Sequence, residues 1–265
     1  RCGVSMPNAG DPRDLVELAI AAESAAWDGF FLWDHIQLDA ASRPAMLDPW
    51  VVLGAIAVRT ARIRIGAMVT PLARRRPWKL AKEITTLDHL SHGRVLVGVG
   101  LGVPPDIEYG AFGEPVEARV HAAMLDEGLP LLDSFLRGDP VDHDGEHYQV
   151  HAHLSPAAFQ RPRPPIWVAA TVSHPRPIAR ARRWDGIFPL GAGNGPLSAA
   201  ELAGLVVTLD PPDGYDVVGL LTPGDTTDDL ARAGATWAVD GPAGPSESFA
   251  SVRRRVEAGP PAAPD

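Results

Sequence analysis

The sequence has only one cysteine, Cys2, so it cannot form an internal disulfide. It has no apolar run near the roughly 18 residues that a membrane-spanning helix needs, and no basic-then-apolar leader at its start. Basic residues are outnumbered, with 24 Lys and Arg against 33 Asp and Glu, and this charge repels nucleic-acid phosphates. We therefore expect a cytoplasmic protein that binds neither a membrane nor a nucleic acid.

The sequence does contain a regular alternation of short apolar runs and segments with helical spacing. Strands are predicted at residues 3–6, 29–33, 63–69, 95–99, 166–170, 186–189, 217–221 and 236–239. Helices are predicted after Asp11-Pro12, after Asp48-Pro49, over 77–90, 116–136 and 174–183, after Ser198, and over 226–233 and 246–257. Eight strand–helix units predict an α/β fold, a (β/α)8 TIM barrel. We expect one domain over residues 1–258 and a frayed tail over 259–265.

Two insertions interrupt the alternation, at 101–115 after strand four and at 138–165 before strand five. Loops of this length usually serve a function or cover a site. Residues 145–150 are predicted to form one arm of a hairpin. His151 and His153 have the spacing of a metal-ligand pair, but they lie far from any strand end. A surface hairpin with hydrated histidines is therefore the favoured interpretation, and we expect no metal.

In a barrel of this kind, reacting groups lie where the strands end. Asp34 and His35 follow strand two, where they could transfer protons or orient a ring cofactor. The alternative is a solvated loop in which Asp34 forms a turn. Three arginines, Arg74, Arg75 and Arg76, stand before a helix N-terminus, whose dipole disfavours positive charge. They either bind an anion or point into water.

Glycines end strand four at Gly98, Gly100 and Gly102, where a ligand could approach the backbone closely. They are not a dinucleotide fingerprint, because Val103 stands at its third glycine position.

Strand five ends in Ala170 and Thr171, and Ser173 precedes the next helix. Hydroxyls and free N–H groups at a helix start can hold a phosphate, although Ser173 could equally be a helix cap. No Gly-x-Ser-x-Gly elbow supports a hydrolase.

The segments 29–35, 65–71, 81–95 and 98–102, taken in order, resemble the bacterial luciferase-like superfamily of flavin- and deazaflavin-dependent oxidoreductases. The resemblance covers most of the first half of the chain and weakens after strand five. It implies a barrel that holds an isoalloxazine-type ring at its mouth. It also implies a non-prolyl cis peptide at Met68–Val69, followed by Thr70, behind that ring.

The resemblance also implies roles for several residues. His35, preceded by Asp34, is the strand-two polar residue, and the Asp-His form is more similar to the deazaflavin-using branch. The cofactor phosphate would lie on the strand-four glycines and the strand-five turn, and the three arginines would meet an anionic tail. The family's sugar-phosphate dehydrogenases have an acidic residue where this chain has Val103 and a tryptophan where it has Asp39, so sugar-phosphate oxidation is disfavoured.

Three functions follow as hypotheses. The first is hydride transfer between coenzyme F420 and a small organic substrate with an activated C=C, C=N or carbonyl group, with His35 as proton donor or acceptor. The second is an FMN-dependent monooxygenase that uses O2 and receives reduced flavin from a separate reductase. The third is a flavin-binding or assembly subunit without catalysis. Family analogy favours a homodimer.

Overall fold

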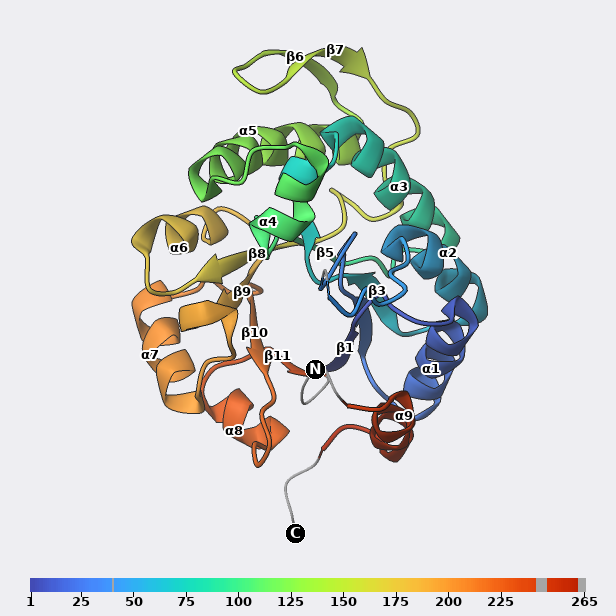
Figure 1. Ribbon diagram of the computed structural model, residues 1–265. Helices are drawn as coiled ribbons and strands as arrows, with labels where there is room; N and C mark the ends of the chain where they lie inside the picture. The colour runs from blue at the N-terminus through green and yellow to red at the C-terminus, as the bar shows by residue number, and fades with distance from the viewer. Residues whose placement is uncertain (40, 242–246, 262–265) are drawn as a thin grey trace.

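The chain forms a closed barrel of parallel strands surrounded by helices (Figure 1). The computed structural model describes residues 1–39, 41–241 and 247–261. The barrel strands are β1 (Cys2–Met6), β2 (Gly29–Leu32), β3 (Arg64–Ala67), β5 (Val97–Gly100), β8 (Ile166–Thr171), β9 (Gly186–Leu190), β10 (Asp216–Leu220) and β11 (Trp237–Asp240). Hydrogen bonds from Ile65 N to Arg94 O (3.0 Å) and from Leu96 N to Ile65 O (2.9 Å) join β3 to the segment before β5. The predicted barrel is therefore confirmed.

The third barrel strand is divided in two. After β3 the chain makes a cis peptide bond between Met68 and Val69, then resumes as β4 (Thr70–Pro71), which pairs with β5. The cis peptide expected from the family resemblance is thus present, and the strand predicted over 63–69 is shorter than expected.

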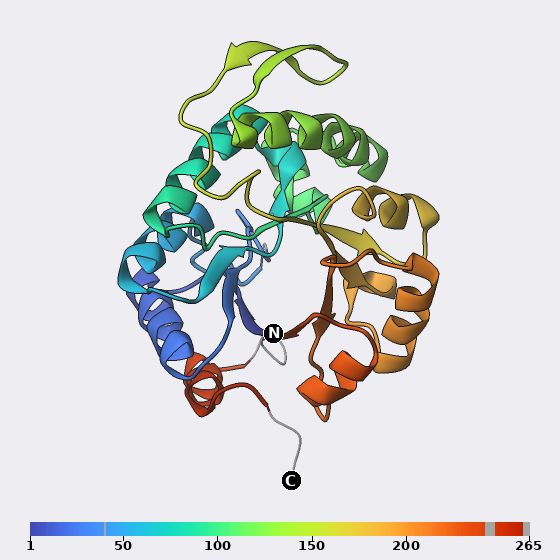
Figure 2. The ribbon, with the colours of Figure 1, turned by 180° about the vertical axis from the view of Figure 1, so that it is seen from behind.

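The helices lie outside the strands, as Figure 2 shows from behind. They are α1 (Pro12–Ser24), α2 (Pro49–Arg59), α3 (Pro77–Leu90), α5 (Ala118–Arg137), α6 (Pro175–Ala181), α7 (Ala199–Leu209), α8 (Thr227–Arg232) and α9 (Phe249–Ala258). Their starts follow the sequence signals. The Asp11 and Asp48 carboxylates cap α1 and α2, and Ser198 forms a capping box with Glu201. The helix predicted from residue 246 begins at Phe249, and residue 246 itself lies outside the described residues.

Aromatic side chains fill the inside of the barrel. Trp167 and Trp237 pack with ring centroids 5.3 Å apart, and Phe31 lies 5.7 Å and 5.8 Å from them. All three are buried. The barrel interior is therefore packed with side chains, as expected for a barrel of eight strands.

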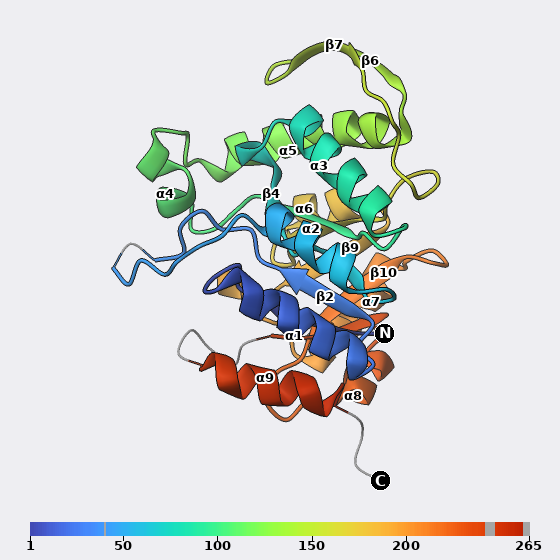
Figure 3. The same ribbon diagram turned by 90° about the vertical axis from the view of Figure 1, so that its right-hand side faces the viewer.

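The two insertions lie at different places. The first contains the short helix α4 (Pro105–Glu108), which lies at the same end of the barrel as the loop after β2 (Figure 3). The second forms an antiparallel hairpin of β6 (Pro140–Asp144) and β7 (Gln149–His153), which stands outside the helices (Figure 3). The expectation of an arm over 145–150 was wrong in its bounds, because residues 145–148 form the turn and the second arm begins at Gln149.

No helix in the described part of the chain is long and apolar enough to span a membrane. Of the tail predicted over 259–265, residues 262–265 lie outside the described residues. Pro261 is held at its carbonyl, which accepts a hydrogen bond from Thr227 Oγ1 (2.9 Å).

Candidate functional site

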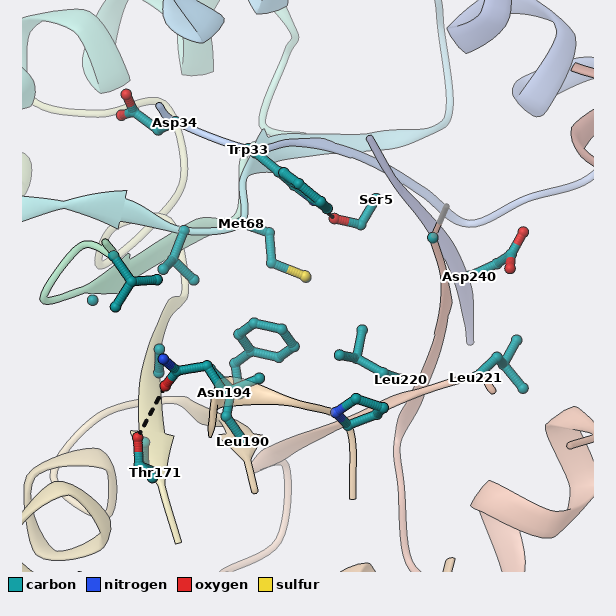
Figure 4. A pocket seen from close by; sticks show the side chains of 18 of the residues that line it. Ser5, Trp33, Asp34, Met68, Thr171, Leu190, Asn194, Leu220, Leu221 and Asp240 are labelled. Atoms are coloured by element: carbon teal, nitrogen blue, oxygen red, sulfur yellow. Dashed lines mark hydrogen bonds between the residues drawn. The ribbon is translucent and has the colours of Figure 1, made fainter. Parts of the chain in front are cut away.

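A cavity of about 740 Å³ opens where the barrel strands end (Figure 4). Its size is typical of a small-molecule site. Its apolar walls come from Met68, Val69, Phe188, Leu190, Leu220 and Leu221. Polar side chains of Ser5, Trp33, His35, Thr171 and Asn194 also line it. Because these residues follow several different strands, the cavity has the position expected for an active site in this fold.

His35 lines the cavity and is held by a carboxylate from the first insertion. Its Nδ1 lies 3.0 Å from Oε1 of Glu108, at the end of α4, and Glu108 is fully buried. The backbone N–H groups of Ile36 and Gln37 donate to the same carboxylate at 3.3 Å. Glu108 therefore fixes the orientation of the imidazole and leaves Nε2 for the cavity.

Sequence reasoning missed Glu108. The position of interest after strand four was Val103, yet the carboxylate that reaches His35 comes from five residues later. One signal was available, because Glu108 stands between the apolar residues Ile107 and Tyr109 in a long insertion. A charged residue with such neighbours is often buried with a partner.

Burial, together with the charge of Arg74, favours the neutral form of His35. Burial lowers the pKa of His35 below its ordinary value, and the nearby Arg74 guanidinium lowers it further, while Asp34 acts in the opposite direction. Arg74 also forms an ion pair with Glu108. With Nδ1–H donated to Glu108, a neutral imidazole presents the lone pair of Nε2 and can accept a proton there.

Asp34, predicted to be a catalytic partner of His35, is among the residues that line the cavity, but its carboxylate binds other side chains. Figure 4 shows it pointing away from the cavity, and the residue is 3% exposed. It accepts hydrogen bonds from Thr70 Oγ1 (2.9 Å), Arg74 Nη2 (2.7 Å) and Arg75 Nε (3.0 Å). These three contacts join the loop after β2 to the segment that begins at β4. Asp34 therefore anchors the segment after β4 beneath the loop that carries His35.

The three arginines expected to meet an anionic cofactor do not line the cavity. Arg74 and Arg75 bind Asp34, and the Arg76 guanidinium lies 6.0 Å from the centre of the Trp78 ring. The positive charge of Arg74 and Arg75 before the N-terminus of α3 is thus balanced by buried carboxylates. The sequence pattern does not reveal these partners.

Thr70, also predicted to bind the cofactor, is fully buried and lies outside the cavity lining. Its hydroxyl donates to Asp34 and accepts from Trp50 Nε1 (3.2 Å). Met68 and Val69, by contrast, do line the cavity as predicted.

The strand-four glycines make room for the neighbouring strand. A Cβ on Gly98 would lie 2.5 Å from the carbonyl oxygen of Ala67, and one on Gly100 would lie 2.7 Å from Val69 Cγ2. Gly100 and Gly102 line the cavity, whereas Gly98 does not. Gly98 and Gly100 therefore let the Met68–Val69 segment pack against β5, while ligand contact at Gly100 and Gly102 stays a prediction.

At the end of β8, Ala170 and Thr171 line the cavity as predicted. Thr171 Oγ1 donates to Asn194 Oδ1 (3.4 Å). Ser173 is exposed and outside the lining, and the N-cap of α6 is His174. The capping role considered for Ser173 is therefore absent, and a phosphate contact at this exposed residue stays a prediction.

Comparison with known proteins gives one family. The model of the luciferase-like monooxygenase family matches residues 2–206. An F420-dependent glucose-6-phosphate dehydrogenase of Nakamurella multipartita is 32% identical over 194 residues, 70% of this chain and 54% of the relative. One from Mycobacterium avium is 38% identical over 144 residues, 52% of this chain and 42% of the relative. The chain thus spans about half the length of the curated relatives it matches.

Solved structures agree on the fold. A coenzyme F420 dependent tetrahydromethanopterin reductase from Methanopyrus kandleri superposes with a TM-score of 0.77 at 17% identity, covering 97% of this chain and 96% of that one. The monooxygenase RslO1 from Streptomyces bottropensis gives a TM-score of 0.73 at 20% identity, covering 97% of each chain.

Proposed function

Because the chain belongs to the luciferase-like monooxygenase family, we propose that it is an oxidoreductase that uses coenzyme F420. In this proposal, hydride passes to or from a small organic substrate with an activated C=C, C=N or carbonyl group. The observation that carries the proposal is the contact of His35 Nδ1 with Glu108 Oε1 (3.0 Å), which holds the imidazole at the edge of a largely apolar cavity. The F420-dependent relatives at 32–38% identity favour F420 over FMN.

The residues present fit a flat ring cofactor. A cavity of about 740 Å³ has room for a ring and a small substrate together. Met68 and Val69 would hold the ring on one side, and Ala170 and Thr171 would lie near its polar chain. Bound deazaflavin would supply or accept the hydride.

An anionic cofactor tail would meet positive charge at the rim, beside β8. His174 and Arg176 are exposed there, next to Pro177, which lines the cavity. Neither has an ion pair with another residue in the described part of the chain. These two residues replace Arg74 and Arg75 as candidates for the tail contact.

His35 would exchange the substrate proton at Nε2. As hydride leaves a substrate hydroxyl carbon, Nε2 takes the hydroxyl proton; in the reverse direction the imidazolium returns it. Glu108 receives Nδ1–H throughout and stabilises the positive charge that develops on the ring. Burial, and then Arg74, which pairs with both Glu108 and Asp34, lower the pKa of His35 and so favour return of the proton from Nε2.

Titration with each cofactor tests the proposal. We expect F420 to bind at least about tenfold more tightly than FMN, because only F420 has the anionic tail that Arg176 would contact. His35→Ala is expected to retain F420 binding and to lose substrate-dependent absorbance change by roughly 10²–10⁴-fold.

Three results would contradict the proposal. Tighter FMN binding with O2 consumption would favour the monooxygenase, and cofactor binding with no effect of His35→Ala would favour a non-catalytic subunit. If the protein bound neither F420 nor FMN, both the F420-dependent oxidoreductase and the FMN-dependent monooxygenase would be rejected.

The remaining expectations stay predictions. We propose one domain over 1–258, a homodimer, a cytoplasmic location and, for the monooxygenase alternative alone, a separate reductase. Sedimentation of the purified protein measures the oligomeric state directly.

A further inference from the structure

We propose that this cavity takes an uncharged, largely apolar substrate and rejects phosphorylated ones. The inference rests on the proposed function of the same cavity and goes further by naming the substrate class. It separates this chain from the sugar-phosphate dehydrogenases to which it is similar in sequence. It depends on three observations. The two cationic side chains that line the cavity already have partners, one lining carboxylate has no ion pair with a described residue, and the walls are largely apolar.

Two cationic side chains line the described cavity, and both already have partners. Arg180 is 7% exposed and forms a two-point ion pair with Asp126, from Nε to Oδ1 (2.7 Å) and from Nη2 to Oδ2 (2.8 Å). Arg255 donates from Nε to Asp240 Oδ2 (2.6 Å) and from Nη2 to the Gly241 carbonyl (3.0 Å). The stretches outside the described residues contain no Lys or Arg. A phosphate in the cavity would therefore have to break an existing ion pair.

A carboxylate adds to this exclusion. Asp225 lines the cavity after β10 and has no ion pair with a described residue. Its Oδ2 accepts hydrogen bonds from the backbone N–H of Thr222 (2.9 Å) and from its hydroxyl (2.7 Å). These bonds fix the carboxylate in place, so a phosphate dianion would face a fixed negative charge with no cation to offset it.

The walls favour apolar groups. Met68, Leu190 and Leu220 surround the same space in Figure 4, and Phe188 and Leu221 also line it. Transfer of a charged group from water to such walls is costly, whereas each apolar group gains by burial. The cofactor's own phosphate and tail do not conflict with this, because they would lie along Thr171 and the turn after β8, toward the exposed Arg176.

The test is a calorimetric titration of the protein with F420 bound, and of the protein alone. One set of probes is the 2-alkanones from butanone to octanone; the other is glucose paired with glucose 6-phosphate. We expect the dissociation constant of the alkanones to fall about threefold to fourfold with each added CH2, as burial of a methylene predicts. We expect glucose 6-phosphate to bind more weakly than glucose. Alkanones that do not bind, a series without a length dependence, or tighter binding of glucose 6-phosphate would overturn the inference.

Charge reversal gives a matched pair of variants. Asp225→Lys should strengthen glucose 6-phosphate binding about tenfold, and Asp225→Asn should strengthen it less, because asparagine removes the repulsion but only lysine also supplies a counterion. Asn194→Lys places a cation elsewhere in the lining of the same cavity and serves the same purpose should Asp225→Lys not fold. Variants that fold without this gain would contradict the electrostatic argument. Failure of the wild type to bind F420 would reject the proposed function, while the alkanone series measured without cofactor still tests the cavity.

Discussion

The ion pairs of Asp34 make a quantitative prediction about stability. Asp34→Asn removes one buried negative charge that receives hydrogen bonds from Thr70, Arg74 and Arg75. Arg74 keeps Glu108, but Arg75 is left with two weaker contacts, to Asp48 at 3.4 Å and Glu83 at 3.5 Å. Breaking a buried ion pair from one side costs about 3–5 kcal/mol of unfolding free energy.

For a chain of this size, about 2–4 °C of melting temperature is lost per kcal/mol, so we expect Asp34→Asn to melt roughly 6–20 °C lower. Differential scanning calorimetry measures this shift. Asp39→Asn is the matched control, because Asp39 is exposed, lies in the same loop and accepts hydrogen bonds at its carboxylate from the backbone N–H groups of nearby Ala41 and Ser42. The control should melt like the wild type.

Below its melting temperature, Asp34→Asn should keep most of its turnover, with far less than the roughly 10²–10⁴-fold loss expected when a proton-transfer group is removed. An unchanged melting temperature together with a collapse of turnover would refute this reasoning. Asp34 would then be the catalytic partner of His35 that the sequence alone favoured.

Three further predictions concern the site. Glu108→Gln should lower kcat by roughly 10²-fold or more, because it releases the His35 ring. The Kd for F420 should stay within about twofold, because Glu108 does not touch the cofactor. An unchanged kcat would show that ring orientation does not matter. Burial lowers the pKa of His35, so a rate that needs neutral imidazole should hold below the ordinary pKa of about 6.5 and fall only at lower pH. Stability should already decline as the pH falls from the ordinary pKa toward the lowered one, because the unfolded chain takes up the proton first. A pH–rate profile that falls already above pH ~7 would contradict it. Gly100→Ala should lower the free energy of unfolding by about 1–3 kcal/mol, since its Cβ would lie 2.7 Å from Val69 Cγ2. A denaturant titration that matches the wild type would disprove that packing role.

The barrel was predictable because its signals are local. Apolar runs such as residues 29–33 and caps such as Asp11 and Asp48 depend on neighbours along the chain, and these elements form close to their predicted bounds. The position of His35 at the cavity followed from the same strand pattern, since a residue just after a barrel strand must lie at that end.

The partners of the site residues were not predictable in the same way. Glu108 lies 73 residues from His35, and Asp34 lies 40 and 41 residues from the arginines that bind it. Such contacts depend on how loops fold over the barrel mouth, which residue type and spacing do not encode. The arginines therefore looked like an anion site, although Arg74 and Arg75 complete buried ion pairs.

A crystal structure of the protein with F420 tests the central claim most directly. We predict that the deazaflavin ring lies against Met68 and Val69 with its reacting face toward the space beside His35 Nε2, and with its tail near Arg176. A ring bound away from Met68, or an imidazole turned out of the cavity in that complex, would contradict the account.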